Sequence, residues 1–127
     1  MKILITGIAG FIGFSLAEFL LKKKIKVFGL DNFDDYYSVI YKKKRIQILN
    51  KYKNFFFKKI NISNKNYLER IILNQKSFDI VYHFAAQPGV RYSLKNPRKY
   101  YNSNIVGYNN LLNSLAKIKV KKIIYAS

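Results

Sequence analysis

The chain has 127 residues, of which half are hydrophobic, with no cysteine and a formal net charge of +18. The lack of cysteine excludes disulfides, thiolate metal sites and cysteine nucleophiles, and no apolar run approaches the ~20 residues of a membrane span. The length fits one domain with a real core. We predict a cytoplasmic protein with no metal site and no membrane partner, because no signal peptide precedes the first strand-like run.

Strands and helices are predicted to alternate from the first residues onward. Strands are expected at 2–6, 26–30, 54–60, 78–84 and 122–126, and helices at 11–24, 37–52, 64–76 and from Pro97 to about Lys117. Apolar residues at helical spacing are Ile12, Leu16, Phe19, Leu20, Ile40, Ile46, Leu49, Leu68, Ile71 and Ile72. The strands are continuously apolar, which is typical of a parallel sheet covered on both faces. We therefore predict an α/β, Rossmann-like, doubly wound parallel sheet that ends after its fifth strand.

The positive charge is spread along the whole chain. The densest clusters, at 22–24 and 42–45, fall at the end of one predicted helix and on another, where cations suit the helix dipole or a solvated face. Lysine comes with abundant Ile, Asn, Tyr and Phe, the residues that AT-rich codons encode. We therefore predict no nucleic-acid partner, although counterion release from phosphates makes such binding the last alternative for a basic chain.

Three glycines follow the first predicted strand, at a spacing of three, in the stretch GIAGFIG. Glycine weakens regular structure by up to about 1 kcal/mol, so a compensating use is expected. At the first strand-to-helix turn of a doubly wound sheet, glycines let the backbone approach a pyrophosphate. We predict that Gly7, Gly10 and Gly13 form a dinucleotide cradle, with the amides of Phe11 and Ile12 as phosphate donors. The alternative is a purely structural turn.

Asp31 ends the second predicted strand, at the position where dinucleotide-binding folds place an acid about 20 residues after the glycines. Its carboxylate can accept hydrogen bonds from both hydroxyls of an adenosine ribose, and it would repel a 2′-phosphate. We predict NAD in preference to NADP, with Asn32 as a neighbouring contact. The alternative is a helix-capping or loop aspartate.

Three further stretches are DNFDDYY at 31–37, HFAAQPGVRYSLKNP at 83–97, and YYNSNIVG at 100–107, which is followed by IIYAS. Together with the glycines they resemble the extended short-chain dehydrogenase/reductase family, in its NAD-dependent epimerase/dehydratase branch. The glycine motif and the H-x-A-A run are typical of the whole family. The stretch DNFDDYY and the pattern Gln-x-Gly-Val-Arg-Tyr-Ser are most similar to the UDP-glucuronate 4-epimerases.

The resemblance implies further site residues. Those near the cofactor would be Phe84, Ala85 and Ala86 beneath the pyrophosphate and ribose, Asn104 near the nicotinamide ribose, and Asn61 and Ile62 at the adenine. Asn61 stands where the family has aspartate. Gln87 and Arg91 would border the sugar, since a guanidinium binds a carboxylate or phosphate bidentately; the alternative is a solvated loop arginine. His83, the one histidine, is expected to pack inside a strand.

The resemblance also implies a reaction. In the family, NAD takes a hydride from C4 of a nucleotide sugar and returns it to the other face, while the tyrosine of a Tyr-x-x-x-Lys pair accepts the hydroxyl proton. No tyrosine here has a lysine four residues later, and Ser127 borders the segment that would carry the catalytic serine or threonine. We expect residues 1–127 to be an incomplete NAD-binding domain, marginally stable and inactive alone. The whole protein would be a homodimer that binds UDP-glucuronate or a related nucleotide sugar.

Two other classes of function stay open. The chain could belong to a UDP-glucose 4-epimerase or a dTDP-glucose 4,6-dehydratase, which share the glycines and the ribose acid. It could also be a noncatalytic NAD-binding or regulatory module.

Overall fold

The computed structural model describes all 127 residues and contains one five-stranded parallel sheet in the order β3-β2-β1-β4-β5. The strands are β1 (Lys2–Thr6), β2 (Lys26–Asp31), β3 (Phe55–Lys59), β4 (Ser77–His83) and β5 (Lys119–Tyr125). The order of the strands reverses between β1 and β4, which makes that boundary the topological switch point. The predicted doubly wound Rossmann-like fold is confirmed.

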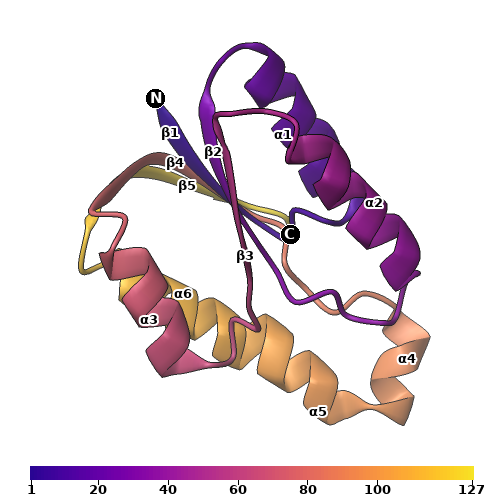
Figure 1. Cartoon of the computed structure of the whole chain (residues 1–127). Helices are drawn as coiled ribbons and strands as arrows, with labels where there is room; N and C mark the ends of the chain where they lie inside the picture. Colours follow the sequence, from indigo (N-terminus) through magenta and orange to yellow (C-terminus); the bar gives the residue numbers. More distant parts are fainter.

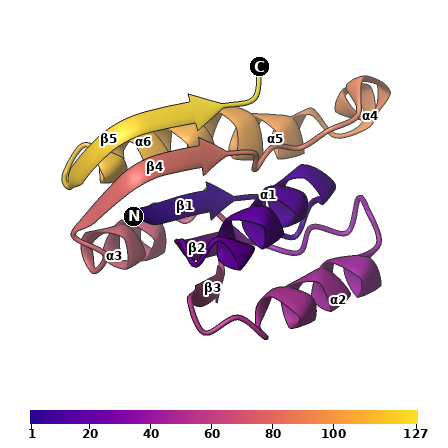
Figure 2. The same cartoon turned by 90° about the horizontal axis from the view of Figure 1, so that it is seen from above.

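Helices cover both faces of the sheet (Figures 1 and 2). One face carries α1 (Phe11–Lys22) and α2 (Val39–Leu49), and the other carries α3 (Lys65–Leu73) and α6 (Tyr108–Leu115). Between β4 and α6 lie α4 (Val90–Lys95), α5 (Pro97–Tyr100) and the π-helical segment η1 (Tyr101–Gly107). No helix has the length and apolar character needed to cross a membrane.

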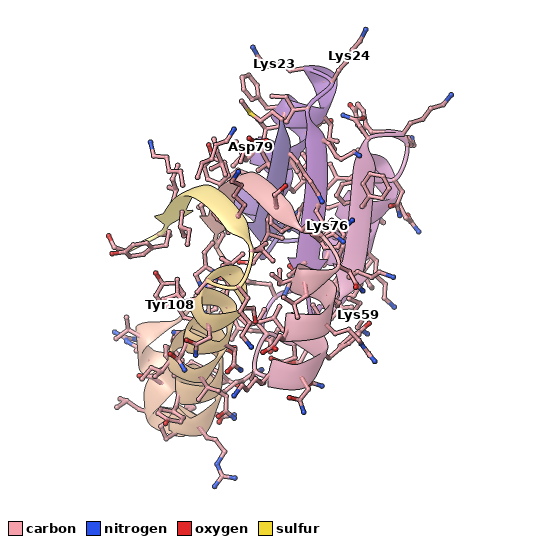
Figure 3. All side chains as sticks on the ribbon, turned by 90° about the vertical axis from the view of Figure 1, so that its left-hand side faces the viewer. Lys23, Lys24, Lys59, Lys76, Asp79 and Tyr108 are labelled. Atoms are coloured by element: carbon pink, nitrogen blue, oxygen red, sulfur yellow. The ribbon has the colours of Figure 1, made fainter.

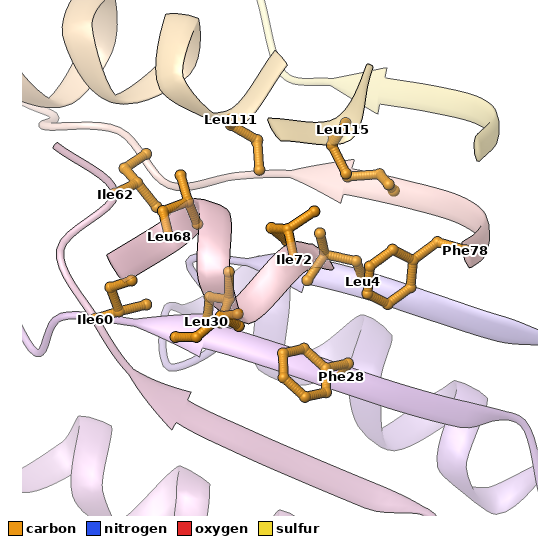
Figure 4. Packing of buried hydrophobic residues seen from close by; sticks show 12 residues of the cluster. Leu4, Phe28, Leu30, Ile60, Ile62, Leu68, Ile72, Phe78, Leu111 and Leu115 are labelled. Atoms are coloured by element: carbon orange, nitrogen blue, oxygen red, sulfur yellow. The ribbon is translucent and has the colours of Figure 1, made fainter. Parts of the chain in front are cut away.

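The core consists of two layers, one on each side of the sheet. Successive strand residues point to opposite faces, so Leu4 of β1 joins the layer beneath α3 and α6, whereas Ile3 and Ile5 join the layer beneath α1 and α2. Figure 4 shows the first layer, in which Leu4 and Phe78 of the sheet face residues of the helices such as Leu111. Because both faces of β1 are buried, the strand needs an unbroken apolar sequence.

The buried face of α1 differs from the predicted one. Gly13, Ala17, Leu20 and Leu21 are buried, whereas Ile12 and Phe19 are largely exposed. Small residues at the contact let the helix approach β1 closely, and the larger side chains are left outside. Ile40 of α2 is also exposed, while the predicted buried face of α3, which consists of Leu68, Ile71 and Ile72, is confirmed.

The segment after β4 departs most from the prediction. The stretch between the fourth predicted strand and Pro97, in which Arg91 was placed, contains α4, and the single helix expected from Pro97 to about Lys117 is divided into α5, η1 and α6 and ends at Leu115. Asn96 caps α5, because its side chain accepts a hydrogen bond from the Lys99 amide at 3.3 Å. The wider π turn then carries Asn104 toward the end of β4.

Most lysines lie on the surface, as expected. Figure 3 shows Lys23 and Lys24 projecting away from the end of α1. Lys24 and Lys76 adopt left-handed backbone conformations, with φ of 62° and 65°, at the turns that lead from helices into β2 and β4. Lys42 is the exception: it lies in the predicted solvated cluster, yet it is only 8% exposed.

Candidate functional site

A pocket of about 380 Å³ lies at the carboxyl ends of β1, β2 and β4. It therefore opens at the switch point, where open α/β sheets bind their ligands. The residues that line it come from the glycine turn, from the loop after β2, from the segment 60–62 after β3 and from the segment 84–88 after β4. The fold thus brings together four stretches that are far apart in the sequence.

The glycine turn is held tightly between two strands. Gly7 has a left-handed backbone, with φ of +70°, and its N–H donates to the Leu30 carbonyl at 2.8 Å. A Cβ at Gly7 would lie 2.8 Å from the Ala85 nitrogen, and one at Gly13 would collide with the Gly7 carbonyl oxygen. Gly10 has more room, since its Cβ would meet only the Gly7 oxygen, at 3.1 Å. Gly7 and Gly13 therefore build the turn, and Gly10 presents bare backbone to the pocket.

The first turn of α1 faces the pocket with free donors. Phe14 N–H donates to the Gly10 carbonyl at 3.0 Å, so the N–H groups of Phe11, Ile12 and Gly13 have no acceptor within the helix. All three residues line the pocket, and the first turn of α1 holds no acidic residue. No acidic residue of the helix itself balances the positive end of its dipole, an arrangement that favours an anionic ligand.

Asp31 is 8% exposed, and backbone donors fix the orientation of its carboxylate. Oδ2 accepts from the Ala9 N–H at 2.9 Å and Oδ1 accepts from the Phe33 N–H at 2.8 Å. Each oxygen keeps a further lone pair for a ligand in the pocket. The neighbouring Asn32 also lines the pocket, and its Oδ1 accepts from the Asp34 N–H at 2.9 Å.

The other predicted cofactor residues line the pocket from two sides. Asn61 and Ile62 lie after β3; the Asn61 side-chain oxygen accepts from the Ser63 N–H at 3.0 Å, and Ile62 is buried. Phe84, Ala85 and Ala86 form the side next to the glycine turn, as the 2.8 Å approach to Gly7 requires. Gln87 follows them and is 4% exposed.

Asn104 and Arg91, which the resemblance places near the nicotinamide ribose and beside the sugar, do not line this pocket. The Asn104 side chain is occupied by the main chain of Gln87: Oδ1 accepts from its N–H at 2.7 Å and Nδ2 donates to its carbonyl at 3.3 Å. Asn104 therefore orders the segment after β4. Arg91 is exposed on α4 and does not line the pocket. Ser127 is exposed at the end of β5.

Lys42, which no sequence motif singled out, lines the pocket from α2. Its Nζ donates to the Asp34 carbonyl at 2.5 Å, and an ammonium group has two further donors to offer a ligand. The signal was present in the sequence, because Lys42 stands four residues before Ile46 and seven before Leu49, on the buried face of the helix. Tyr36 and Tyr37 also line the pocket.

His83 has the structural role that its place in a buried strand predicts. Its Nδ1 lies 2.7 Å from the Thr6 hydroxyl, and its ring stacks on Tyr108 with centroids 4.9 Å apart. The same hydroxyl accepts from the Ala85 N–H at 3.2 Å, so the network joins the ends of β1 and β4 beneath the pocket. Burial lowers the pKa of His83 to about 4, which keeps the ring neutral near pH 7.

Comparisons with known proteins agree with this geometry. The family model for GDP-mannose 4,6 dehydratase matches residues 4–127. The chain is 45% identical to protein CapI of Staphylococcus aureus and 46% identical to a UDP-glucuronate 4-epimerase of Thermodesulfobacterium geofontis, over 100% and 98% of its own length. It spans 37% and 38% of the length of those two proteins.

A solved structure shows the same fold. The crystal structure of UDP-glucuronic acid 4-epimerase from Bacillus cereus, in complex with UDP-glucuronic acid and NAD, matches with a TM-score of 0.87 and 38% identity. The match covers 98% of this chain and 39% of that one. The expected resemblance to the epimerase/dehydratase branch of the extended short-chain dehydrogenases is confirmed: the chain belongs to the GDP-mannose 4,6 dehydratase family.

Proposed function

We propose that residues 1–127 are the NAD-binding part of a nucleotide-sugar 4-epimerase of the UDP-glucuronate type. One observation carries the proposal: a single pocket at the switch point combines the free N–H groups of α1, the oriented carboxylate of Asp31 and the small residues Ala85 and Ala86. The relatives named as UDP-glucuronate 4-epimerases, and the complex of one such enzyme with NAD, support the assignment.

The residues of the pocket suit a dinucleotide. The N–H groups at the start of α1 would receive the pyrophosphate, and bare backbone at Gly10 would let it come close. Asp31 would accept hydrogen bonds from the adenosine ribose, whose 2′-phosphate in NADP it would repel. Lys42 would donate to the same ribose or to the adjoining phosphate. Asn61 and Ile62 would border the adenine.

Bound NAD would supply hydride chemistry at C4 of the sugar, and residues 1–127 would supply position and electrostatics. The proton acceptor of the family, the tyrosine of a Tyr-x-x-x-Lys pair, has no counterpart in these residues. We therefore propose that residues 1–127 bind NAD and do not turn over a sugar by themselves. The whole protein would act as a homodimer in the cytoplasm on UDP-glucuronate or a related nucleotide sugar.

The first test measures the binding of NAD and of NADP to the purified 127-residue chain by calorimetry. We expect NAD to bind and NADP to bind more weakly. Asp31→Asn should reduce the preference, because it removes the charge that repels the 2′-phosphate while retaining one acceptor. No binding of either dinucleotide to a folded chain would refute the proposal.

The second test is turnover of UDP-glucuronate by the protein expressed from its complete reading frame, with UDP-glucose and dTDP-glucose as competing substrates. The proposal predicts UDP-galacturonate, the C4 epimer. The family model is one for a dehydratase, and a 4-keto-6-deoxy sugar as product would place the protein with the dehydratases instead. NAD binding without turnover of any of the three would favour a noncatalytic module.

A further inference from the structure

The loop after β2 contacts the segment after β4 through side chains to which the proposed function assigns no role. In Figure 1 the connection from β2 to α2 runs past the segment that leads from β4 into α4. Asp34 and Tyr36 of this loop line the pocket, whereas Tyr92 of α4 and Lys99 of α5 lie outside it. We call these four residues the clasp.

The ionic part of the clasp joins Asp34 to Lys99. Lys99 Nζ lies 2.9 Å from Asp34 Oδ2, and both side chains are about three-quarters shielded from solvent, with 24% and 23% exposed. Asp35 adds a second carboxylate at 3.3 Å. Burial by itself would raise the pKa of Asp34, but the hydrogen bonds from Lys99 and from the Tyr36 N–H outweigh that effect and lower it. The hydrogen bond to Asp34 raises the pKa of Lys99, so the pair stays charged.

The aromatic part of the clasp is an independent contact between the same two segments. The rings of Tyr36 and Tyr92 lie 5.0 Å apart, and Lys99 Nζ lies 5.7 Å from the centre of the Tyr92 ring. Tyr36 also packs against Gly89, where an added Cβ would collide with its hydroxyl group. Gly89 has a φ of +92°, a conformation that glycine adopts readily.

Asp34 connects the clasp to the ligand-facing groups. Its N–H donates to Asn32 at 2.9 Å, and its carbonyl accepts from the ammonium of Lys42. Movement of Asp34 would therefore move Asn32 and Lys42, which both line the pocket. Lys99 and Tyr92 do not line the pocket, and their contacts with Asp34 and Tyr36 give them a route to a ligand through the loop.

We propose that the clasp holds the loop after β2 against the pocket and slows the release of the bound dinucleotide, with Lys99 and Tyr92 as positioning residues. This inference rests on the proposed NAD site and adds to it a set of contacts that sets the lifetime of the complex. A loop held at both its ionic and its aromatic contact spends less time open, so the clasp acts on dissociation more than on association.

The test compares Lys99→Met with Arg98→Met in the protein expressed from its complete reading frame. Arg98 is the exposed neighbour of Lys99 on α5 and has no acidic partner within 4 Å, so it is a matched control for loss of one positive charge. Stopped-flow measurements give the association and dissociation rates of NAD. We expect Lys99→Met to speed dissociation roughly two- to fivefold, as for loss of one partly exposed ion pair, with little change in association.

Two further variants separate positioning from general stability. Lys99→Arg keeps the charge and should restore the slow dissociation, and Tyr92→Leu should speed dissociation through the aromatic contact alone. If NAD binds but dissociates from Lys99→Met and Arg98→Met at the same rate, the clasp is refuted and the NAD site stands. If the unmodified protein does not bind NAD, the proposed function fails and the clasp fails with it.

Discussion

The two segments that meet at the pocket are built differently. The β1–α1–β2 unit is held by backbone donors and close packing: the Gly7 N–H bonds to the Leu30 carbonyl, the Ala9 N–H bonds to the Asp31 carboxylate, and α1 packs with small residues against β1. The connection from β4 to α6 is irregular, with Val90 and Leu94 of α4 more than 80% exposed. It depends on individual side-chain contacts, such as that between the Asn104 amide and the main chain of Gln87.

This difference has a physical consequence for substitutions. In the first unit the neighbours of Gly7 and Gly13 are backbone atoms closer than 3.0 Å to an added Cβ, which cannot move without displacing a strand, so a methyl group at either position should damage the whole fold. In the connection from β4 to α6, side chains such as Lys99 and Tyr92 contact the loop after β2. A substitution there should change the dissociation rate or the affinity of NAD and leave the fold intact. The predictions below test that contrast.

The largest effect is expected from Gly13→Ala. The new Cβ would collide with the Gly7 carbonyl and lie 2.8 Å from the Ile8 Cα, and both are backbone atoms. Relieving the collision must push α1 away from β1. We expect the free energy of unfolding to fall by about 3 kcal/mol or more and NAD binding to be lost, as measured by denaturant titration and calorimetry.

Gly10→Ala is the matched control within the same turn. Its Cβ would meet only the Gly7 oxygen, at 3.1 Å, and Gly10 has an extended backbone with φ of −70°. The fold should therefore survive, while NAD affinity falls because the methyl group occupies space in the pocket. Equal losses of stability in the two variants would contradict the distinct roles assigned to these glycines.

His83 should make the stability of the fold depend on pH. Its pKa is lowered to about 4 by burial, from an ordinary value of 6.5. The unfolded chain therefore binds a proton below pH 6.5 that the folded chain does not accept until about pH 4. The contribution of neutral His83 to the free energy of unfolding is fully present above pH 6.5. The free energy of unfolding should fall by about 3 kcal/mol as the pH drops to 4, since each unit of pKa difference is worth about 1.4 kcal/mol.

His83→Asn isolates that contribution. Asparagine retains an acceptor for the Thr6 hydroxyl and does not titrate, so the variant should be less stable near pH 7 but should lose the dependence on pH between 6.5 and 4. Urea titrations at several pH values measure the slope. The assignment is wrong if the slope is the same with asparagine at this position.

The sequence predicted the first unit well and the second poorly, for the same physical reason. The glycines, Asp31 and the unbroken apolar strands are local signals, and each was found in the place expected. The division of the helix after Pro97 depends on Asn96 and on a hydrogen-bonded contact of the Asn104 side chain with the Gln87 main chain, which no motif or periodicity encodes. Lys42 was only partly predictable. Its spacing from Ile46 and Leu49 places it on the buried face of the helix, but its position in a run of lysines favoured exposure to solvent.

Lys42→Met should lower the affinity for NAD roughly tenfold, the loss expected for one hydrogen bond to a charged donor. The methionine retains an unbranched apolar side chain and loses the ammonium group that holds the Asp34 carbonyl. Because we propose that this group lies beside the adenosine ribose, which carries a 2′-phosphate in NADP, the binding of NADP should weaken by more than that of NAD. Calorimetry with both dinucleotides measures the two affinities; unchanged affinity for both would show that the lysine does not reach the ligand.

Arg91→Met should have the smallest effect, a change in NAD affinity of less than about twofold, as for an exposed charge without a close partner. Lys42 and Arg91 make a matched pair, since each variant removes one cation from the neighbourhood of the pocket. The cation that the family resemblance placed beside the sugar is exposed on α4, and the one that it did not suggest is buried in the pocket. If Arg91→Met weakened NAD binding as much as Lys42→Met, long-range attraction by positive charge would explain both results. Burial in the pocket would then not be what distinguishes the two residues.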